Sequence, residues 1–231
     1  MRIRHDAAGP GAEVIDRPAA CFGDRPSGAQ IELVVIHYTA MANAEAALER
    51  LCGSEFDVSA HYLVGRDGTV FRIVREDKRA WHAGAGSWAG RGDVNSRSIG
   101  IELDNDGMSK FTEPLMDKLE ILLADILDRH GLPPQAVIGH SDMAPDRKRD
   151  PGRHFDWRRL AEKGLSVWPA HLPSGDFIRD AAVFGYPVHA GESAILSAFR
   201  QRFNPSARGP VSKDDEALMA GLARRFPAEV A

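Results

Sequence analysis

The chain has 231 residues, of which 43% are hydrophobic and 27% are charged, and its formal net charge is -4. This length allows one well-buried core and a small additional module. The negative net charge, without a long basic run, argues against a nucleic-acid partner.

The N-terminus carries charged residues but no apolar stretch of the kind found in export signals, and no later segment reaches the roughly 18 apolar residues of a spanning helix. We therefore expect a cytoplasmic protein without a membrane span. A periplasmic or envelope location is the alternative, because a chain whose signal had been removed would look the same. The two cysteines, Cys21 and Cys52, could form one disulfide, but two free thiols are the expectation.

The first two thirds of the chain alternate between strand and helix patterns. Residues 1 to about 30 are rich in Gly, Pro, Ala and Asp and predict an extended lead-in. The elements expected after it are a buried strand at 31–38, a helix at 42–51, hairpin strands at 61–64 and 70–74, a strand at 98–103, a helix at 114–130 and a strand at 136–139. This alternation predicts an α/β fold with a mixed central β-sheet flanked by helices.

The last quarter of the chain has a different pattern. Three short amphipathic stretches, at 176–183, 193–203 and 213–226, are separated by proline-containing turns and carry no strand pattern. A module of about 55 residues is small enough to need docking on its neighbour for stability. We place the boundary near Trp168-Pro169, which divides the chain into residues 1–170 and a three-helix module over 171–231.

Three residues at or beyond the ends of predicted strands suggest a metal site. His37 ends one strand, His140 follows another, and Asp150 lies ten residues further on. Strands of one sheet end side by side, so these side chains can meet, and a His, His, Asp set is typical of hydrolytic zinc. Lys148 lies two residues before Asp150, where its charge would weaken metal binding. A lysine in that place makes sense if it faces a substrate oxygen that becomes negative during the reaction.

Glu102 is the best candidate for a general base because it interrupts an otherwise apolar strand. Buried carboxylates are costly unless they are paired, bound to metal or functional. Each residue also has a simpler interpretation: His37 as a satisfied histidine at a strand end, Glu102 as a half-exposed strand residue, His140 and Asp150 as turn caps, and Lys148 as part of a solvated basic loop. Their occurrence together in one chain favours the hydrolytic site.

Six short segments between about residues 30 and 160 follow one another in the order of a known family. They are VIHYT (35–39), VSAHYLV (58–64), RDGTV (66–70), AWHAG (80–84), SIGIE (98–102) and HSDMAPDRKRDPG (140–152). Each segment alone is weak, but the ordered set is specific. On these segments the chain resembles the zinc-dependent N-acetylmuramoyl-L-alanine amidases of the type 2 family, which also includes peptidoglycan recognition proteins and phage lysozyme-type amidases.

The resemblance implies roles for the candidate residues. His37, His140 and Asp150 would be the Zn²⁺ ligands, Glu102 the catalytic acid and base, and Lys148 the group that stabilises the transition state. Phage members carry a tyrosine directly before the histidine that corresponds to His61. The chain has Ala60 in that place, so its Glu102 is expected to carry the tyrosine's role. Recognition proteins that have lost activity lack the third, anionic ligand, and the presence of Asp150 favours an enzyme.

Five further residues are expected near the substrate. His61 is expected to pack or hydrogen-bond near the site, and His82 to line the cleft. The loop that carries Trp81, Trp88 and Asn95 is the expected wall for sugar and peptide.

The implied reaction is hydrolysis of the amide between the lactyl group of N-acetylmuramic acid, in its 1,6-anhydro form, and L-alanine of the stem peptide, in cell-wall recycling. The alternatives are an envelope amidase that acts on intact peptidoglycan and a muropeptide-binding protein without turnover. A zinc peptidase that cuts within the stem peptide is disfavoured, because no His-Glu-x-x-His signature is present.

The C-terminal stretches resemble a reduced peptidoglycan-binding module of three helices. Such a module favours an envelope enzyme, whereas the lack of an export signal favours recycling in the cytoplasm, and we give the second more weight. A helical buttress packed on the enzyme domain is the other interpretation of these stretches.

Overall fold

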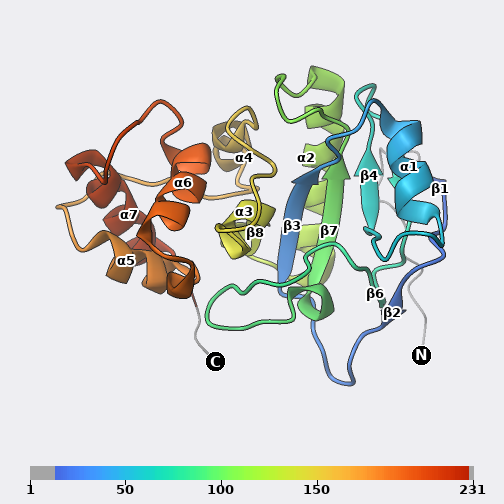
Figure 1. Cartoon of the computed structure of the whole chain (residues 1–231), viewed down its shortest axis with the longest axis horizontal. Coiled ribbons are helices and arrows are strands. Elements are labelled where there is room, and N and C mark those ends of the chain that lie inside the picture. The colour runs from blue at the N-terminus through green and yellow to red at the C-terminus, as the bar shows by residue number, and fades with distance from the viewer. Residues whose placement is uncertain (1–13, 229–231) are drawn as a thin grey trace.

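Residues 14–228 are described in a computed structural model whose central feature is a mixed sheet of six strands (Figure 1). In order across the sheet the strands are β1 (Val14–Asp16), β5 (Val70–Arg72), β4 (Tyr62–Val64), β7 (Ser98–Leu103), β3 (Leu33–Tyr38) and β8 (Val137–Gly139). The last four are mutually parallel, β5 is antiparallel to β4, and β1 is parallel to β5. This arrangement confirms the predicted mixed sheet.

One face of the sheet is covered by α2 (Glu113–His130) and α4 (Trp157–Glu162). A stripe of leucine and isoleucine at helical spacing gives α2 its buried face. The helix has Pro114 in its first turn and ends at Gly131, whose φ of 63° is in the left-handed region that glycine adopts easily. Its buried side chains pack against strand residues such as Val34 and Ile99.

The opposite face is covered at two places. Helix α1 (Ala44–Cys52) is capped by Asn43, whose side chain accepts from the backbone N–H of Ala46, and it packs over β4 and β5. The helices α5 (Phe177–Phe184), α6 (Glu192–Phe203) and α7 (Lys213–Arg225) lie at the β8 side of the sheet (Figure 1). Their aromatic residues share one continuous hydrophobic core with Leu33, Val35 and Ile138 of the sheet.

Several short elements complete the fold. A two-stranded ribbon pairs β2 (Gly23–Asp24) with β6 (Lys78–Arg79). The remaining elements are one short helix, α3 (His140–Met143), and three 3₁₀ turns, η1 (Val94–Arg97), η2 (Pro134–Ala136) and η3 (Val188–Ala190).

The three C-terminal helices and the main strands lie where the sequence predicts them. The segment predicted as an extended lead-in differs from that prediction, because it contains the strands β1 and β2. Its first thirteen residues lie outside the described part of the chain. These strands, with β6, α3 and α4, are too short for a periodic pattern to reveal. Cys21 and Cys52 are free thiols. Among residues 14–228, no helix is both long and apolar enough to cross a bilayer.

Candidate active site and metal centre

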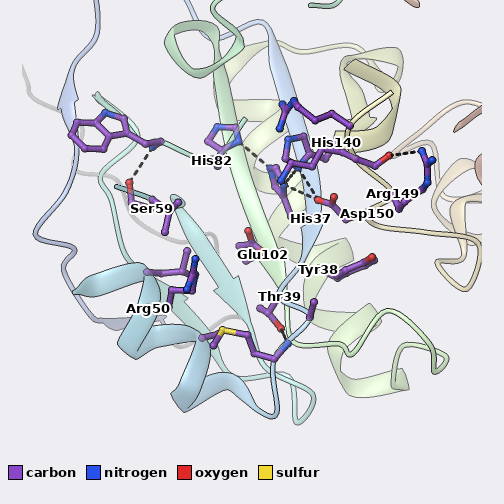
Figure 2. Close-up of a pocket in the computed structure, with 18 residues that line it drawn as sticks. His37, Tyr38, Thr39, Arg50, Ser59, His82, Glu102, His140, Arg149 and Asp150 are labelled. Atoms are coloured by element: carbon purple, nitrogen blue, oxygen red, sulfur yellow. Dashed lines mark hydrogen bonds and ion pairs between the residues drawn. The ribbon is translucent and has the colours of Figure 1, made fainter. Parts of the chain in front are cut away.

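The candidate site lies where three parallel strands end (Figure 2). His37 on β3 and Glu102 on β7 are direct neighbours in the strand register. His140 follows Gly139, the last residue of β8, and begins α3. Because parallel strands share one carboxyl edge, these residues meet although more than sixty positions separate His37 from Glu102.

Three ligand atoms converge at this edge. Nδ1 of His37 lies 2.9 Å from Nδ1 of His140 and 3.0 Å from Oδ2 of Asp150, and the last two atoms are 2.9 Å apart. All three residues are buried. The loop from α3 returns Asp150 to the site, and the Ser141 N–H donates to the Asp150 carbonyl at 2.9 Å. The structure thus brings together the three predicted metal ligands.

The second nitrogen of His140 shows which way its ring is protonated. Nε2 lies 2.9 Å from the carbonyl oxygen of Ala83, which can only accept, so Nε2 carries the proton. The Nδ1 lone pair therefore points at Asp150 and His37. Metal-binding histidines commonly have their other nitrogen fixed in this way.

A chain of hydrogen bonds fixes His37 in the same manner. The Ser98 hydroxyl donates to the Val94 carbonyl at 2.6 Å, so its oxygen accepts from Nε2 of His82 at 3.1 Å. Nδ1 of His82 is then free to accept from Nε2 of His37 at 3.0 Å. This chain leaves the Nδ1 lone pair of His37 directed at the other two ligand atoms.

Gly100 makes room for this chain. A Cβ atom at position 100 would overlap the ring of His82, which lies across β7. The glycine in the SIGIE segment is therefore required by the close approach of a histidine to the strand.

The donor set fits a zinc ion. Burial, reinforced by the neighbouring His140, lowers the pKa of His37 to about 4, so the ring is neutral at pH 7. Two neutral imidazole lone pairs and a carboxylate this close together repel one another unless a cation lies among them. The set of two imidazoles and one carboxylate is the ligand set of hydrolytic zinc.

Glu102 lies beside the candidate ligands without being one of them. Its Oε2 is shielded from solvent and has no hydrogen-bond partner among residues 14–228. Burial, with repulsion from Asp150, raises the pKa of Glu102 to about 8, against the opposing charge of Lys148. A carboxyl group without partners and with a pKa near neutrality can both take up and release a proton at the site.

A cavity of about 470 Å³ opens over these groups. Glu102, Lys148 and the three candidate ligands all line it. Helix α1 contributes an apolar wall and Arg50, and the loop after α3 contributes Arg147 and Arg149. A space of this size with a cationic rim suits a small ligand that carries carboxylates.

Two of the five residues expected near the substrate, Trp81 and His82, line the cavity. The other three are buried and do not line the cavity, although His61 and Asn95 both contact His82. His61 accepts the Gly100 N–H at 2.9 Å and joins two strands. The Asn95 side chain accepts from the backbone N–H groups of His82 and Ala83, at 3.1 and 2.8 Å.

Trp88 is the third residue outside the cavity. Its ring packs edge-on against Phe184 and Tyr186 of the C-terminal part, with centroids 5.5 and 5.3 Å away. The position of Trp88 in a glycine-rich loop predicted that it would line the ligand site. Its actual ring partners lie about a hundred positions further along the chain, so no local sequence pattern could reveal them.

Sequence reasoning missed several residues of the site. Tyr38 and Arg50 line the cavity, and Ser98 and Gly100 arrange His37 through His82. Only Gly100 carried a signal, since a glycine within an apolar strand indicates a close approach by another group.

Comparison with known proteins agrees with this geometry. Residues 27–153 match the family described as N-acetylmuramoyl-L-alanine amidase. The chain is similar to the N-acetylmuramoyl-L-alanine amidase AmiD of Escherichia coli K12, with 31% identity over 85% of this chain and 84% of AmiD. It is also similar to the 1,6-anhydro-N-acetylmuramyl-L-alanine amidase AmpD of the same organism, with 43% identity over 45% of this chain and 56% of AmpD.

Solved structures show the same likeness. AmiD in complex with the substrate anhydro-N-acetylmuramic acid-L-Ala-D-gamma-Glu-L-Lys superposes with a TM-score of 0.78 at 30% identity, covering 87% of this chain and 92% of AmiD. AmpDh3 of Pseudomonas aeruginosa with anhydromuramic pentapeptide gives 0.76 at 28% identity, covering 91% of this chain and 96% of AmpDh3.

Proposed function

The chain belongs to the N-acetylmuramoyl-L-alanine amidase family, and on that premise we propose that it is a zinc enzyme acting on 1,6-anhydro-muropeptides. The bond cleaved is the amide between the lactyl group of the anhydro sugar and L-alanine of the stem peptide. The observation that carries the proposal is the convergence of His37, His140 and Asp150 beside the unpartnered carboxyl group of Glu102.

His37, His140 and Asp150 would hold the zinc through two nitrogens and one carboxylate oxygen. Zinc bound by them would polarise the lactyl carbonyl and lower the pKa of a bound water toward neutrality. Ala83 and the chain from His82 to Ser98 keep the two histidines in the tautomer that binding requires.

Glu102 moves the protons of the reaction. Its carboxylate takes a proton from the attacking water as the new C–O bond forms, and it returns that proton to the nitrogen of L-alanine as the C–N bond breaks. No tyrosine takes this part at the position before His61, which is Ala60. The Tyr62 hydroxyl is buried and donates to Glu76 at 2.7 Å, so it is directed away from the cavity.

Lys148 stabilises the transition state. The carbonyl oxygen gains negative charge as water adds, and an ammonium group in the same cavity stabilises that charge more strongly than it stabilises the neutral amide. Lys148 has no hydrogen-bond or ion-pair partner for its ammonium group within residues 14–228, so the charge is available to the substrate.

We further propose that the protein prefers small anhydro-muropeptides and that it acts in cell-wall recycling in the cytoplasm. Two similar proteins, AmiD and AmpDh3, have been solved with anhydro-muropeptide ligands. The cationic rim formed by Arg50, Arg147 and Arg149 suits the carboxylates of such a ligand.

The test is to incubate the purified protein with anhydro-N-acetylmuramoyl-tripeptide and, separately, with intact sacculi, and to identify the products by mass. We expect free tripeptide beginning with L-alanine, no release after chelation, and recovery when zinc is added back. Cleavage between two amino acids, or full activity without metal, would refute the zinc amidase. Faster release from sacculi would refute the recycling role, and binding without product would indicate a non-catalytic receptor.

A further inference from the structure

A buried carboxylate outside the ligand set joins the metal loop to the C-terminal helices. Asp142 lies two residues after His140 and is 1% exposed. Its Oδ1 accepts from the Tyr186 hydroxyl at 2.7 Å, and its Oδ2 accepts from Arg202 at 2.6 Å and from the Gly139 N–H at 2.8 Å. Both of its charged or hydroxyl partners come from the C-terminal part of the chain.

Arg202 of α6 contacts Asp142, and it also contacts β8, the strand that leads to His140. Its second terminal nitrogen donates to the Val137 carbonyl at 2.9 Å, at the start of β8, and to the Ser166 hydroxyl at 3.2 Å. The guanidinium also stacks 4.1 Å above the centre of a Trp157 ring. One side chain thus contacts both ends of the short segment from Val137 to Asp142.

This segment carries one candidate ligand and is bonded to a second. His140 opens α3, and the next N–H, that of Ser141, donates to the carbonyl of Asp150. Asp142 also fixes the N–H of Gly139, directly before His140. A tilt of α3 would therefore displace two of the three groups that converge at the site.

We propose that Tyr186 and Arg202 are positioning residues for the metal centre, which the C-terminal helices support through Asp142. This inference rests on the proposed zinc function. It assigns the helices a task within the catalytic unit, in place of a separable wall-binding module. A carboxylate with donors on both oxygens is held in one orientation, and the helix that it caps is held with it.

A second buried ion pair offers a matched control. The side chains of Arg200 and Asp215 lie 2.5 Å apart, and the other hydrogen bonds of these two side chains stay within residues 200–215. A change there weakens the helical part without touching Asp142. If the helices only added stability, loss of the Arg202–Asp142 pair and loss of the Arg200–Asp215 pair would have the same effect on zinc binding.

The experiment measures the zinc dissociation constant of the full chain by competition with a chromophoric chelator, and thermal unfolding of the metal-free protein alongside. We expect Tyr186→Phe and Arg202→Met to weaken zinc binding by about 10-fold, toward the lower end of the range for residues that orient ligands. Activity should recover when zinc is raised to saturation. Arg200→Met should lower the unfolding temperature but leave the zinc dissociation constant at the wild-type value.

Wild-type zinc affinity in Tyr186→Phe, or equal weakening in Arg200→Met, would overturn the proposal. Tyr186→Phe removes a single hydroxyl, so it stays informative even if Arg202→Met does not fold. Failure of the unmodified protein to bind zinc would refute the proposed function itself, which separates the two failures.

Discussion

Two glutamates of this molecule, Glu76 and Glu102, have opposite surroundings. Glu76, after the β4–β5 hairpin, is 2% exposed and accepts from the Tyr62 hydroxyl, the Arg129 guanidinium and Nε2 of His130 at 2.6 to 2.9 Å. Glu102, at the end of β7, has an oxygen that is shielded from water and lacks a partner within residues 14–228.

The pKa values of the two carboxyl groups are shifted in opposite directions. Burial alone would raise the pKa of Glu76, but hydrogen bonds from Arg129, His130 and Tyr62 hold it well below the usual range. Burial raises the pKa of Glu102 to about 8, since nothing comparable offsets it. The difference shows that partners decide whether a buried carboxylate serves stability or chemistry.

The largest effect is expected at Glu102. Glu102→Gln should lower kcat by about 10²–10⁴-fold, because the amide cannot move protons. Zinc content should stay the same, and the free energy of unfolding should equal or exceed that of the wild type, because a neutral amide removes an unpartnered carboxyl group. Steady-state kinetics, metal analysis and urea unfolding check this. A variant with a normal kcat would show that Glu102 takes no part in the mechanism, and the contrast with Glu76 would then have no bearing on catalysis.

The opposite outcome is expected at Glu76. Glu76→Gln should lower the free energy of unfolding by about 3 kcal/mol at pH 7, because Arg129 and His130 lose a buried charged partner. The turnover number of the folded variant should be unchanged. Urea unfolding and kinetics measured on the same sample provide the check.

The Glu76 contribution should also depend on pH. Its folded-state pKa lies below the value of 4.5 for an unperturbed glutamate, so the stabilisation is complete above about pH 4.5 and is lost as the pH falls toward the folded value. The gap between wild type and Glu76→Gln should therefore narrow when unfolding is measured at pH 3. A gap that widens in acid would contradict the assignment.

Lys148 extends the comparison to a cation, since its ammonium group has no hydrogen-bond or ion-pair partner among residues 14–228. Lys148→Ala should lower kcat by about 10²–10³-fold, the usual loss when one group facing the oxyanion is removed. Zinc should remain bound, since the ammonium repels the metal and does not hold it. Metal content and kinetics on the same sample test this, and loss of zinc would show that Lys148 has a structural role.

The smallest effect is expected at Ser98, which orients His37 through His82. Ser98→Ala removes the hydroxyl that sets the tautomer of His82, and zinc binding should weaken by about 10-fold. The matched control is Ser96→Ala, whose hydroxyl bonds to Asp93 and Arg79, away from the histidines. Competition with a chelator measures both. Equal zinc affinity in the two variants would show that the chain does not orient His37.

The sequence predicts much of this arrangement because its signals are local. Apolar runs reveal the strands, and the shared carboxyl edge of parallel strands then brings His37, Glu102 and His140 together. Contacts between distant segments leave no such signal. The bond from Tyr186 to Asp142 spans 44 positions and that from Arg202 spans 60, so neither could be expected from a pattern.

The partners of Glu76 are likewise invisible in the sequence, since they come from β4 and from the end of α2. A strand residue with a carboxylate could be a base, a structural ion pair or a half-exposed side chain, and only the surrounding donors distinguish them.

The most direct measurement compares Glu102→Gln and Glu76→Gln side by side for turnover of anhydro-N-acetylmuramoyl-tripeptide and for free energy of unfolding. We predict a crossed result: Glu102→Gln loses turnover by at least about 100-fold and keeps its stability, while Glu76→Gln loses stability and keeps its turnover. If both variants lost turnover in proportion to stability, Glu102 would be a structural residue, and the proposed active site would be contradicted.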